Sequence, residues 1–179
     1  MMKRETIMLA VLLFVGAVTE MKAQEVEEDL DAKYATELVK PGTAAPDFEL
    51  KTPEGETFRL SSLTDRIVVL DFWASWCSDC RRDAPEVVKL YQTYHPKGVE
   101  FVGVSMDTDV EAWQNAVKQY GIEYLQVSEL KKFKETAISK AYGIKWIPSL
   151  VVIGKDGKVL LSTVLSEKVG RLLEELTRE

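Results

Sequence analysis

Short apolar segments predict seven β-strands of two kinds. The first two segments alternate apolar and polar residues around Pro53-Glu54-Gly55, as a small β-hairpin does. Most of the later segments are runs of apolar residues, which are typical of strands buried on both faces of a sheet. The predicted strands are residues 47–50, 57–60, 67–72, 99–105, 124–127, 149–153 and 158–164.

Apolar residues at helical spacing predict four helices after the third strand. The first begins near Cys80, ends by His95-Pro96 and contains Pro85, which predicts a kink. The face that it shares with Cys80 carries Ala84, Val87, Val88 and Tyr91. The other helices are predicted at residues 109–120, 133–142 and 167–176. The order ββ, then βαβαβαββα, indicates an α/β protein with a mixed central sheet flanked by helices.

Three segments of different composition divide the chain. In residues 1–23, Lys3 and Arg4 precede an apolar run of 12 residues, which predicts a signal peptide; an uncleaved anchor is the alternative. Residues 24–40 hold six acids and two lysines and predict a solvated acidic linker. Residues 41–179 are predicted to form one folded domain.

Charge and cysteine content narrow the function classes. Without residues 1–23 the chain has 20 basic and 27 acidic residues, a net charge of −7, which disfavours nucleic acid as a partner. The two cysteines, Cys77 and Cys80, lie three positions apart, so the chain has no scaffold of structural disulfides. The two cysteines are therefore predicted to be reactive residues rather than parts of a structural disulfide scaffold.

Cys77 and Cys80 form a C-x-x-C motif between a predicted strand and a predicted helix. Unpaired N–H groups and the helix dipole stabilise a thiolate at a helix N-terminus, so we expect Cys77 to attack and Cys80 to resolve the mixed disulfide. Two other interpretations stay open: a static structural disulfide, and half of a zinc site with the lone His95. We assign His95 no role and expect no metal and no cofactor.

Two carboxylates accompany the cysteines. Asp71 interrupts an apolar strand, where burial raises the pKa of a carboxyl group, and we interpret it as the base that takes the proton from Cys80. The alternative is a strand-end aspartate bonded to local backbone. Asp83 lies one turn beyond Cys80 and is either a group that tunes the sulfurs or a solvated acid near the helix start.

Three residues are candidates for substrate binding. Of Trp73 and Trp76, we expect one to pack in the core and the other, Trp76, to form an apolar rim for a polypeptide; two core residues are the alternative. Pro148 follows Ile147 before a buried strand, where a cis bond would present the Ile147 backbone to a substrate. A trans proline at a strand entry is the alternative.

Together these residues resemble the thioredoxin superfamily, and within it the exported TlpA-like and ResA-like thiol-disulfide oxidoreductases. The resemblance rests on residues 69–85 and 142–149 and spans roughly residue 41 to the C-terminus. It implies a thioredoxin fold with an N-terminal β-hairpin extension and an inserted β-α element within residues 99–127. It also implies site roles: nucleophile for Cys77, resolving thiol for Cys80, buried acid for Asp71 and cis-proline for Pro148. Asp83 stands where ResA-like proteins usually have a glutamate that tunes the thiols.

Asp79 departs from the proline that the family commonly has before the second cysteine. A negative charge beside a thiolate raises its pKa and favours the disulfide, an effect that Arg81 opposes in part. The sequence therefore predicts a reductant of exported protein disulfides, kept reduced by a membrane electron donor. A disulfide oxidase or isomerase of the same fold is the alternative.

Two further function classes compete with disulfide exchange. A peroxidase of the peroxiredoxin class shares the fold and the P-D-F-x-L opening at residues 46–50, but it needs a threonine where this chain has Ala74. A non-enzymatic binding or chaperone module is suggested by the apolar residues Trp76, Trp146 and Ile147. The intact C-x-x-C motif argues against that module.

Overall fold

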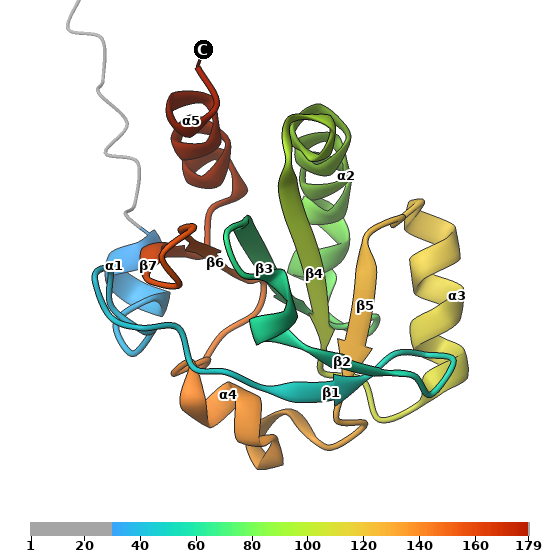
Figure 1. The fold of residues 1–179 in the computed structure, drawn as a ribbon. Coiled ribbons are helices and arrows are strands. Elements are labelled where there is room, and N and C mark those ends of the chain that lie inside the picture. Colours follow the sequence, from blue (N-terminus) through green and yellow to red (C-terminus); the bar gives the residue numbers. More distant parts are fainter. Residues whose placement is uncertain (1–29, 179) are drawn as a thin grey trace, which may run out of the picture.

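The structure, a computed structural model, describes residues 30–178 (Figure 1). The predicted signal peptide and the first six residues of the predicted linker lie outside the described residues. Within residues 30–178, none of the helices is both long and apolar enough to cross a membrane.

Seven strands form one mixed sheet in the order β2-β1-β5-β4-β3-β6-β7. The parallel strands β3, β4 and β5 form its centre, and all other neighbours are antiparallel. The strands are β1 (Glu49–Lys51), β2 (Thr57–Arg59), β3 (Ile67–Trp73), β4 (Val99–Ser105), β5 (Leu125–Ser128), β6 (Ser149–Ile153) and β7 (Val159–Thr163). The predicted mixed sheet and the predicted N-terminal hairpin are confirmed.

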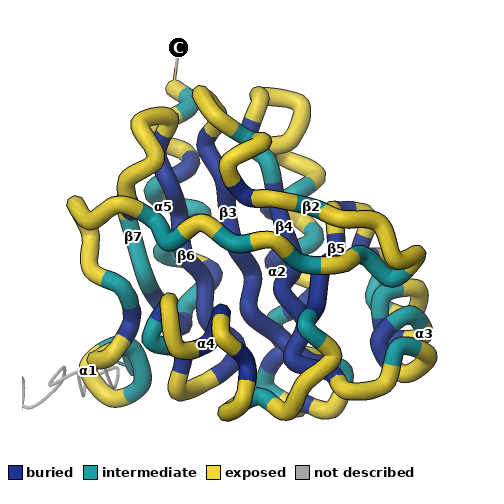
Figure 2. The backbone as a smooth tube through the Cα atoms, turned by 60° about the horizontal axis from the view of Figure 1, so that its bottom comes forward, coloured by how far each residue is buried: buried dark blue, intermediate teal, exposed yellow. Residues whose placement is uncertain are grey.

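In the described part of the chain, five α-helices surround the sheet: α1 (Leu30–Tyr34), α2 (Ser78–Tyr94), α3 (Val110–Tyr120), α4 (Ala137–Ala141) and α5 (Ser166–Leu176). In Figure 1, α2 and α5 stand on one side of the central strands and α4 on the other. Every residue of β3 is buried between these layers, and Figure 2 shows the buried strands at the centre of the molecule. This burial explains why every residue of β3 except Asp71 is apolar.

Two helices differ in detail from the prediction. The buried face of α2 carries Cys80, Ala84, Val87, Leu90 and Tyr94, whereas Val88 and Tyr91 are half-buried. As predicted, Pro85 lies inside this helix. The predicted helix 133–142 is divided, because Thr136 is extended and its hydroxyl caps α4 by accepting a hydrogen bond from the Ser139 N–H at 3.3 Å.

The described part of the acidic linker packs on the domain, unlike the solvated stretch that its composition predicts. Leu38 is 2% exposed. The Val39 N–H donates to the Tyr142 carbonyl at 3.0 Å, and the Ser162 hydroxyl donates to the Val39 carbonyl at 2.6 Å. One apolar side chain and part of the main chain are therefore buried here; of the described acids, Asp31 is half-buried and paired with Lys168, and Glu37 is exposed. The predicted boundary at residue 41 stays a prediction.

Candidate active site

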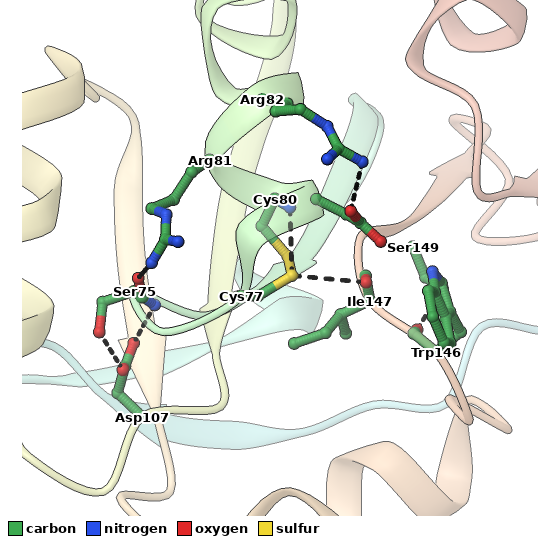
Figure 3. The surroundings of a disulfide bond; sticks show 10 residues. Ser75, Cys77, Cys80, Arg81, Arg82, Asp107, Trp146, Ile147 and Ser149 are labelled. Atoms are coloured by element: carbon green, nitrogen blue, oxygen red, sulfur yellow. Dashed lines mark hydrogen bonds and ion pairs between the residues drawn. A yellow bond between two sulfur atoms is a disulfide. The ribbon is translucent and has the colours of Figure 1, made fainter.

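The two cysteines lie where β3 gives way to α2 (Figure 3). Cys77 is the N-cap residue of α2 and forms a disulfide with Cys80. The Cys80 N–H donates to the Cys77 sulfur at 3.1 Å, and Cys77 is the more exposed of the two, at 8% against 3%. A thiolate formed on Cys77 would thus lie at the positive end of the α2 dipole, beside a backbone donor.

The loop before β6 faces the same sulfur. The Ile147–Pro148 peptide bond is cis, as the resemblance implies. The Ile147 carbonyl oxygen lies 3.5 Å from the Cys77 sulfur. The Ser149 hydroxyl donates to the Trp146 carbonyl at 2.7 Å and thereby closes this turn. Ile147 and Pro148 are therefore brought together with the cysteines.

The tryptophans divide as expected between the core and the rim. Trp73 is 3% exposed, and its indole N–H donates to the Gln126 side-chain oxygen at 2.9 Å. Trp76 is 56% exposed, and Trp146 is 37% exposed next to Ile147. Two exposed indoles thus lie close in sequence to the groups around the Cys77 sulfur.

Asp71 is buried in β3 and bonds to a distant side chain rather than to local backbone. The Tyr124 hydroxyl donates to its Oδ2 atom at 2.8 Å. Burial raises the pKa of Asp71 to about 7; the Tyr124 hydrogen bond opposes this rise and the negative charge of Asp83 adds to it. Asp71, Cys80, Asp83 and Pro148 line one small cavity, about large enough for a single water molecule. Asp71 and Cys80 therefore border one space of the size that a proton-relaying water needs.

Asp83 is half-buried and is not the solvated acid of the alternative interpretation. The Ser166 hydroxyl donates to its Oδ1 atom at 2.5 Å. Its Oδ2 atom is buried and has no hydrogen-bond partner among the described residues. Burial raises the pKa of this carboxyl group; the Ser166 hydrogen bond opposes the rise and the charge of Glu86 adds to it.

The two arginines after Cys80 turn to opposite sides of the disulfide (Figure 3). Arg82 forms the ion pair with Asp79, whereas the sequence led us to expect partial compensation by Arg81. Arg81 instead donates to the Ser75 carbonyl at 3.3 Å. Helical geometry explains the difference, because positions three apart lie on one side of a helix and positions two apart do not.

Asp107 is a site residue that the sequence interpretation missed. It is 2% exposed, and its carboxylate accepts hydrogen bonds from the Ser75 N–H at 3.0 Å, the Ser75 hydroxyl at 2.6 Å and the Ser105 hydroxyl at 2.8 Å. It thereby fixes the loop that leads to Cys77. Its place just after β4 was a usable signal, because the carboxyl ends of neighbouring parallel strands meet at one edge of a sheet.

His95 follows the far end of α2, 15 residues beyond Cys80. At 1.5 Å per residue the separation is roughly 22 Å, so His95 and the cysteines do not share a metal site.

Comparisons with known proteins agree with this geometry. The AhpC/TSA family matches residues 41–162. A thiol-disulfide oxidoreductase ResA from Bacillus thuringiensis subsp. konkukian (strain 97-27) is 32% identical over 143 residues, which cover 80% of each chain.

Two solved structures have the same fold. A thiol-disulfide oxidoreductase from Bacteroides fragilis NCTC 9343 has a TM-score of 0.70 and 30% identity, covering 75% of this chain and 99% of that one. The thioredoxin domain of a thiol-disulfide oxidoreductase from Bacteroides vulgatus has a TM-score of 0.71 and 25% identity, covering 78% and 99%. The chain therefore belongs to the AhpC/TSA family of the thioredoxin superfamily, and it is a thiol-disulfide oxidoreductase.

Proposed function

We propose that this protein reduces disulfides of exported proteins by dithiol-disulfide exchange. The observation that carries the proposal is the position of Cys77 at the N-terminus of α2, with its sulfur 3.5 Å from the Ile147 carbonyl. The exposed Trp76 offers an apolar rim beside it, and the Ile147 backbone offers polar groups to an extended polypeptide.

The reaction transfers two electrons from the protein to its substrate. The Cys77 thiolate attacks one sulfur of the substrate disulfide, so that a mixed disulfide forms and the other substrate sulfur leaves as a thiolate. Cys80, once deprotonated, attacks the Cys77 sulfur, forms the Cys77–Cys80 disulfide and releases the second substrate thiolate. The protein dithiol is oxidised and the substrate disulfide becomes two thiols.

Asp71 is the proposed base for the second step, because it shares a cavity with Cys80 and has a pKa near 7. Asp83 is proposed to tune the sulfurs from the same cavity. Trp76, Ile147 and Pro148 are proposed to bind the substrate chain.

The proposed direction rests on Asp79. Its negative charge disfavours a thiolate nearby, and its partner Arg82 is largely solvent-exposed, so the ion pair compensates the charge weakly. The disulfide is then favoured and the dithiol is a good reductant. A measured reduction potential more positive than about −150 mV, near that of strong oxidants, would contradict this direction.

Export and electron supply belong to the same proposal. Residues 1–23 are proposed to be a signal peptide that is removed, and residues 41–179 to be the exported domain. A dithiol of a membrane protein is proposed to reduce the Cys77–Cys80 disulfide after each cycle. N-terminal sequencing of the protein recovered from the cell envelope tests the cleavage. A chain that still begins at Met1 would support the anchor instead.

The substrates can be identified by trapping. Replacing Cys80 with Ala removes the resolving thiol, so mixed disulfides on Cys77 should accumulate in the cell envelope and can be identified after non-reducing separation. A Cys77→Ala variant is the matched control and should capture far less. Equal capture by both variants, or none by Cys80→Ala under conditions that require the protein, would contradict the proposal.

A further inference from the structure

A tyrosine that lies two strands away holds the carboxyl group of Asp71. Tyr124 directly precedes β5, and β4 lies between β5 and β3 (Figure 1). The Tyr124 hydroxyl nevertheless donates to Asp71 Oδ2 at 2.8 Å. In β4 the register partner of Asp71 is Gly103, which has no side chain and so offers no side-chain donor. The hydrogen bond to this carboxyl group therefore comes from beyond the neighbouring strand.

Packing fixes Tyr124 in place. The residue is buried, and its ring centroid lies 5.5 Å from that of Tyr91 in α2 and 5.9 Å from that of Phe101 in β4. Its carbonyl oxygen accepts a hydrogen bond from the side-chain amide of Gln126 at 3.4 Å. Both the ring and the main chain are thus held, so the hydroxyl loses little further freedom when it binds Asp71.

The arrangement engages one oxygen of Asp71 and leaves the other free for chemistry. Within residues 30–178, the Tyr124 hydroxyl is the one hydrogen-bond donor to this carboxyl group, and it binds Oδ2. Burial and the negative charge of Asp71 raise the pKa of Tyr124 well above its ordinary value, so the hydroxyl keeps its proton and stays a donor. Oδ1 is then the atom that can accept a proton across the small cavity that Asp71 and Cys80 line.

The other groups around Asp71 do not favour its charged form. Cys80 and Asp83 face it from α2 across the same cavity, and its register partner in β6 is the apolar Leu150. Burial raises the pKa of Asp71, the Tyr124 hydrogen bond lowers it, and the charge of Asp83 raises it further. Among these neighbours, Tyr124 is therefore the group that favours the carboxylate over the carboxylic acid.

We propose that Tyr124 is a positioning residue for disulfide exchange: its hydroxyl holds Oδ2 of Asp71, favours the carboxylate form and leaves Oδ1 to take the proton from Cys80. The inference rests on the proposed function, since it assigns a partner to the base of the second step. It gives the connection between α3 and β5 a part in the reaction.

The titration of Asp71 tests this role directly. Tyr124→Phe removes the hydroxyl and keeps the ring, and the NMR signal of the Asp71 carboxyl carbon in the oxidised protein reports the midpoint. We expect the midpoint to rise by about one pH unit, which is about tenfold in proton affinity. Tyr91→Phe removes a hydroxyl from the neighbouring ring and is the matched control, with an unchanged midpoint.

A variant that keeps the hydroxyl gives a shift of the opposite sign. Tyr124→3-fluorotyrosine retains the ring and the hydrogen bond, and its more acidic hydroxyl is a stronger donor, so the Asp71 midpoint should fall below that of the wild type. The dispersion of signals in the same spectra confirms that each variant is folded.

The pH profile of the second step separates positioning from a general loss of structure. Rapid mixing of the reduced protein with a chromogenic aromatic disulfide releases a second thiolate when Cys80 resolves the mixed disulfide. Tyr124→Phe should slow this release about fivefold near pH 7 but bring it within about twofold of the wild type near pH 9, because the base is still present. Asp71→Asn, which lacks the base, should be slower than Tyr124→Phe at both pH values.

The failures can be told apart. An unshifted midpoint in Tyr124→Phe, or a rate lowered equally at both pH values, would overturn the role of Tyr124 and leave Asp71 as the base. A second step that Asp71→Asn does not slow would overturn the base and this inference with it. If the reduced protein does not reduce the aromatic disulfide at all, the proposed function itself fails.

Discussion

At the scale of single residues, the raised pKa that suits Asp71 as a base also makes the stability of the folded protein depend on pH. In the unfolded chain it titrates near pH 4, and in the folded protein near pH 7. Between these values the folded protein keeps a proton that the unfolded chain has released. Stability therefore falls as the pH rises from about 4 to about 7, and the cost above this window is on the order of 4 kcal/mol.

Asp71→Asn removes that cost and the base together. Relative to the wild type, the oxidised variant should gain free energy of unfolding as the pH rises from 4 to 7, by a few kcal/mol at pH 8, as denaturant titrations at several pH values would measure. Resolution of the mixed disulfide should slow by about 10- to 100-fold near pH 7. Asp156→Asn, on an exposed hairpin, is the control. A pH-independent stability difference or an unchanged rate would refute the assignment.

Asp107 positions the active-site loop without contacting either sulfur in the interactions described above. Asp107→Ala removes three hydrogen bonds to a carboxylate and should cost about 2–4 kcal/mol of unfolding free energy. We also expect slower peptide disulfide reduction and a higher pKa for Cys77, because the loop before Cys77 loses its anchor. Iodoacetamide alkylation against pH measures that pKa.

Asp109→Ala is the matched control for this variant. Asp109 is exposed, and its carboxylate caps α3 by accepting a hydrogen bond from the Ala112 N–H at 2.9 Å. Its removal should cost about 1 kcal/mol and leave the pKa of Cys77 unchanged. Identical alkylation profiles for the two variants would show that Asp107 is purely structural.

At the scale of elements, Gly103 in β4 leaves room for the side chain of Gln126 in β5, which binds the indole of Trp73. A Cβ atom on Gly103 would overlap the side-chain amide of Gln126, its partner in the β4–β5 pairing. That amide oxygen accepts from the indole N–H of Trp73 at 2.9 Å and of Trp113 at 3.4 Å. The glycine is therefore required by a side chain and not by an unusual backbone conformation.

Gly103→Ala should displace this amide and cost about 2–3 kcal/mol of unfolding free energy. Gln126→Ala leaves two indole donors without their acceptor and should cost a similar amount. Because both variants lose the same hydrogen bonds, the double variant should cost little more than Gln126→Ala alone, a coupling of at least about 1 kcal/mol in denaturant titrations. Additive losses would contradict a shared cause.

The elements that the sequence predicts well are those with a local signal. The runs at 67–72 and 99–105 fall within one residue of β3 and β4, because strands buried on both faces need apolar residues throughout. The helix predicted at residues 109–120 matches α3, which Asp109 caps. The division at Thr136 was missed, since apolar spacing does not register a hydroxyl that caps the following turn.

The site residues that the sequence predicts are likewise those with a local signal. Cys77, Cys80, Asp71 and Pro148 stand in patterns of a few residues, and the structure brings all four together. Asp107 and Tyr124 reach the site from other elements, so their contribution depends on strand order and chain packing. A single sequence carries no local mark of those contacts.

At the scale of the whole molecule, residues 30–40 pack against the rest of the described chain. Leu38→Ala should therefore cost about 2–5 kcal/mol of unfolding free energy, as for other buried leucines. Leu176→Ala, at a position that is 41% exposed, is the control and should cost much less. Thermal and denaturant unfolding of both variants would measure the difference. Equal small losses would mean that this segment adds nothing to the fold.

The contact that fixes α1 joins two parts of the chain that both lie outside the family match. Asp31 precedes residue 41, and its partners Thr163, Val164 and Lys168 follow residue 162. The N-terminal segment and the C-terminal end therefore hold each other in place. In chimeras with relatives, an N-terminal segment exchanged by itself would bring Asp31 to a surface without its partners, whereas both ends exchanged together would keep α1 in place.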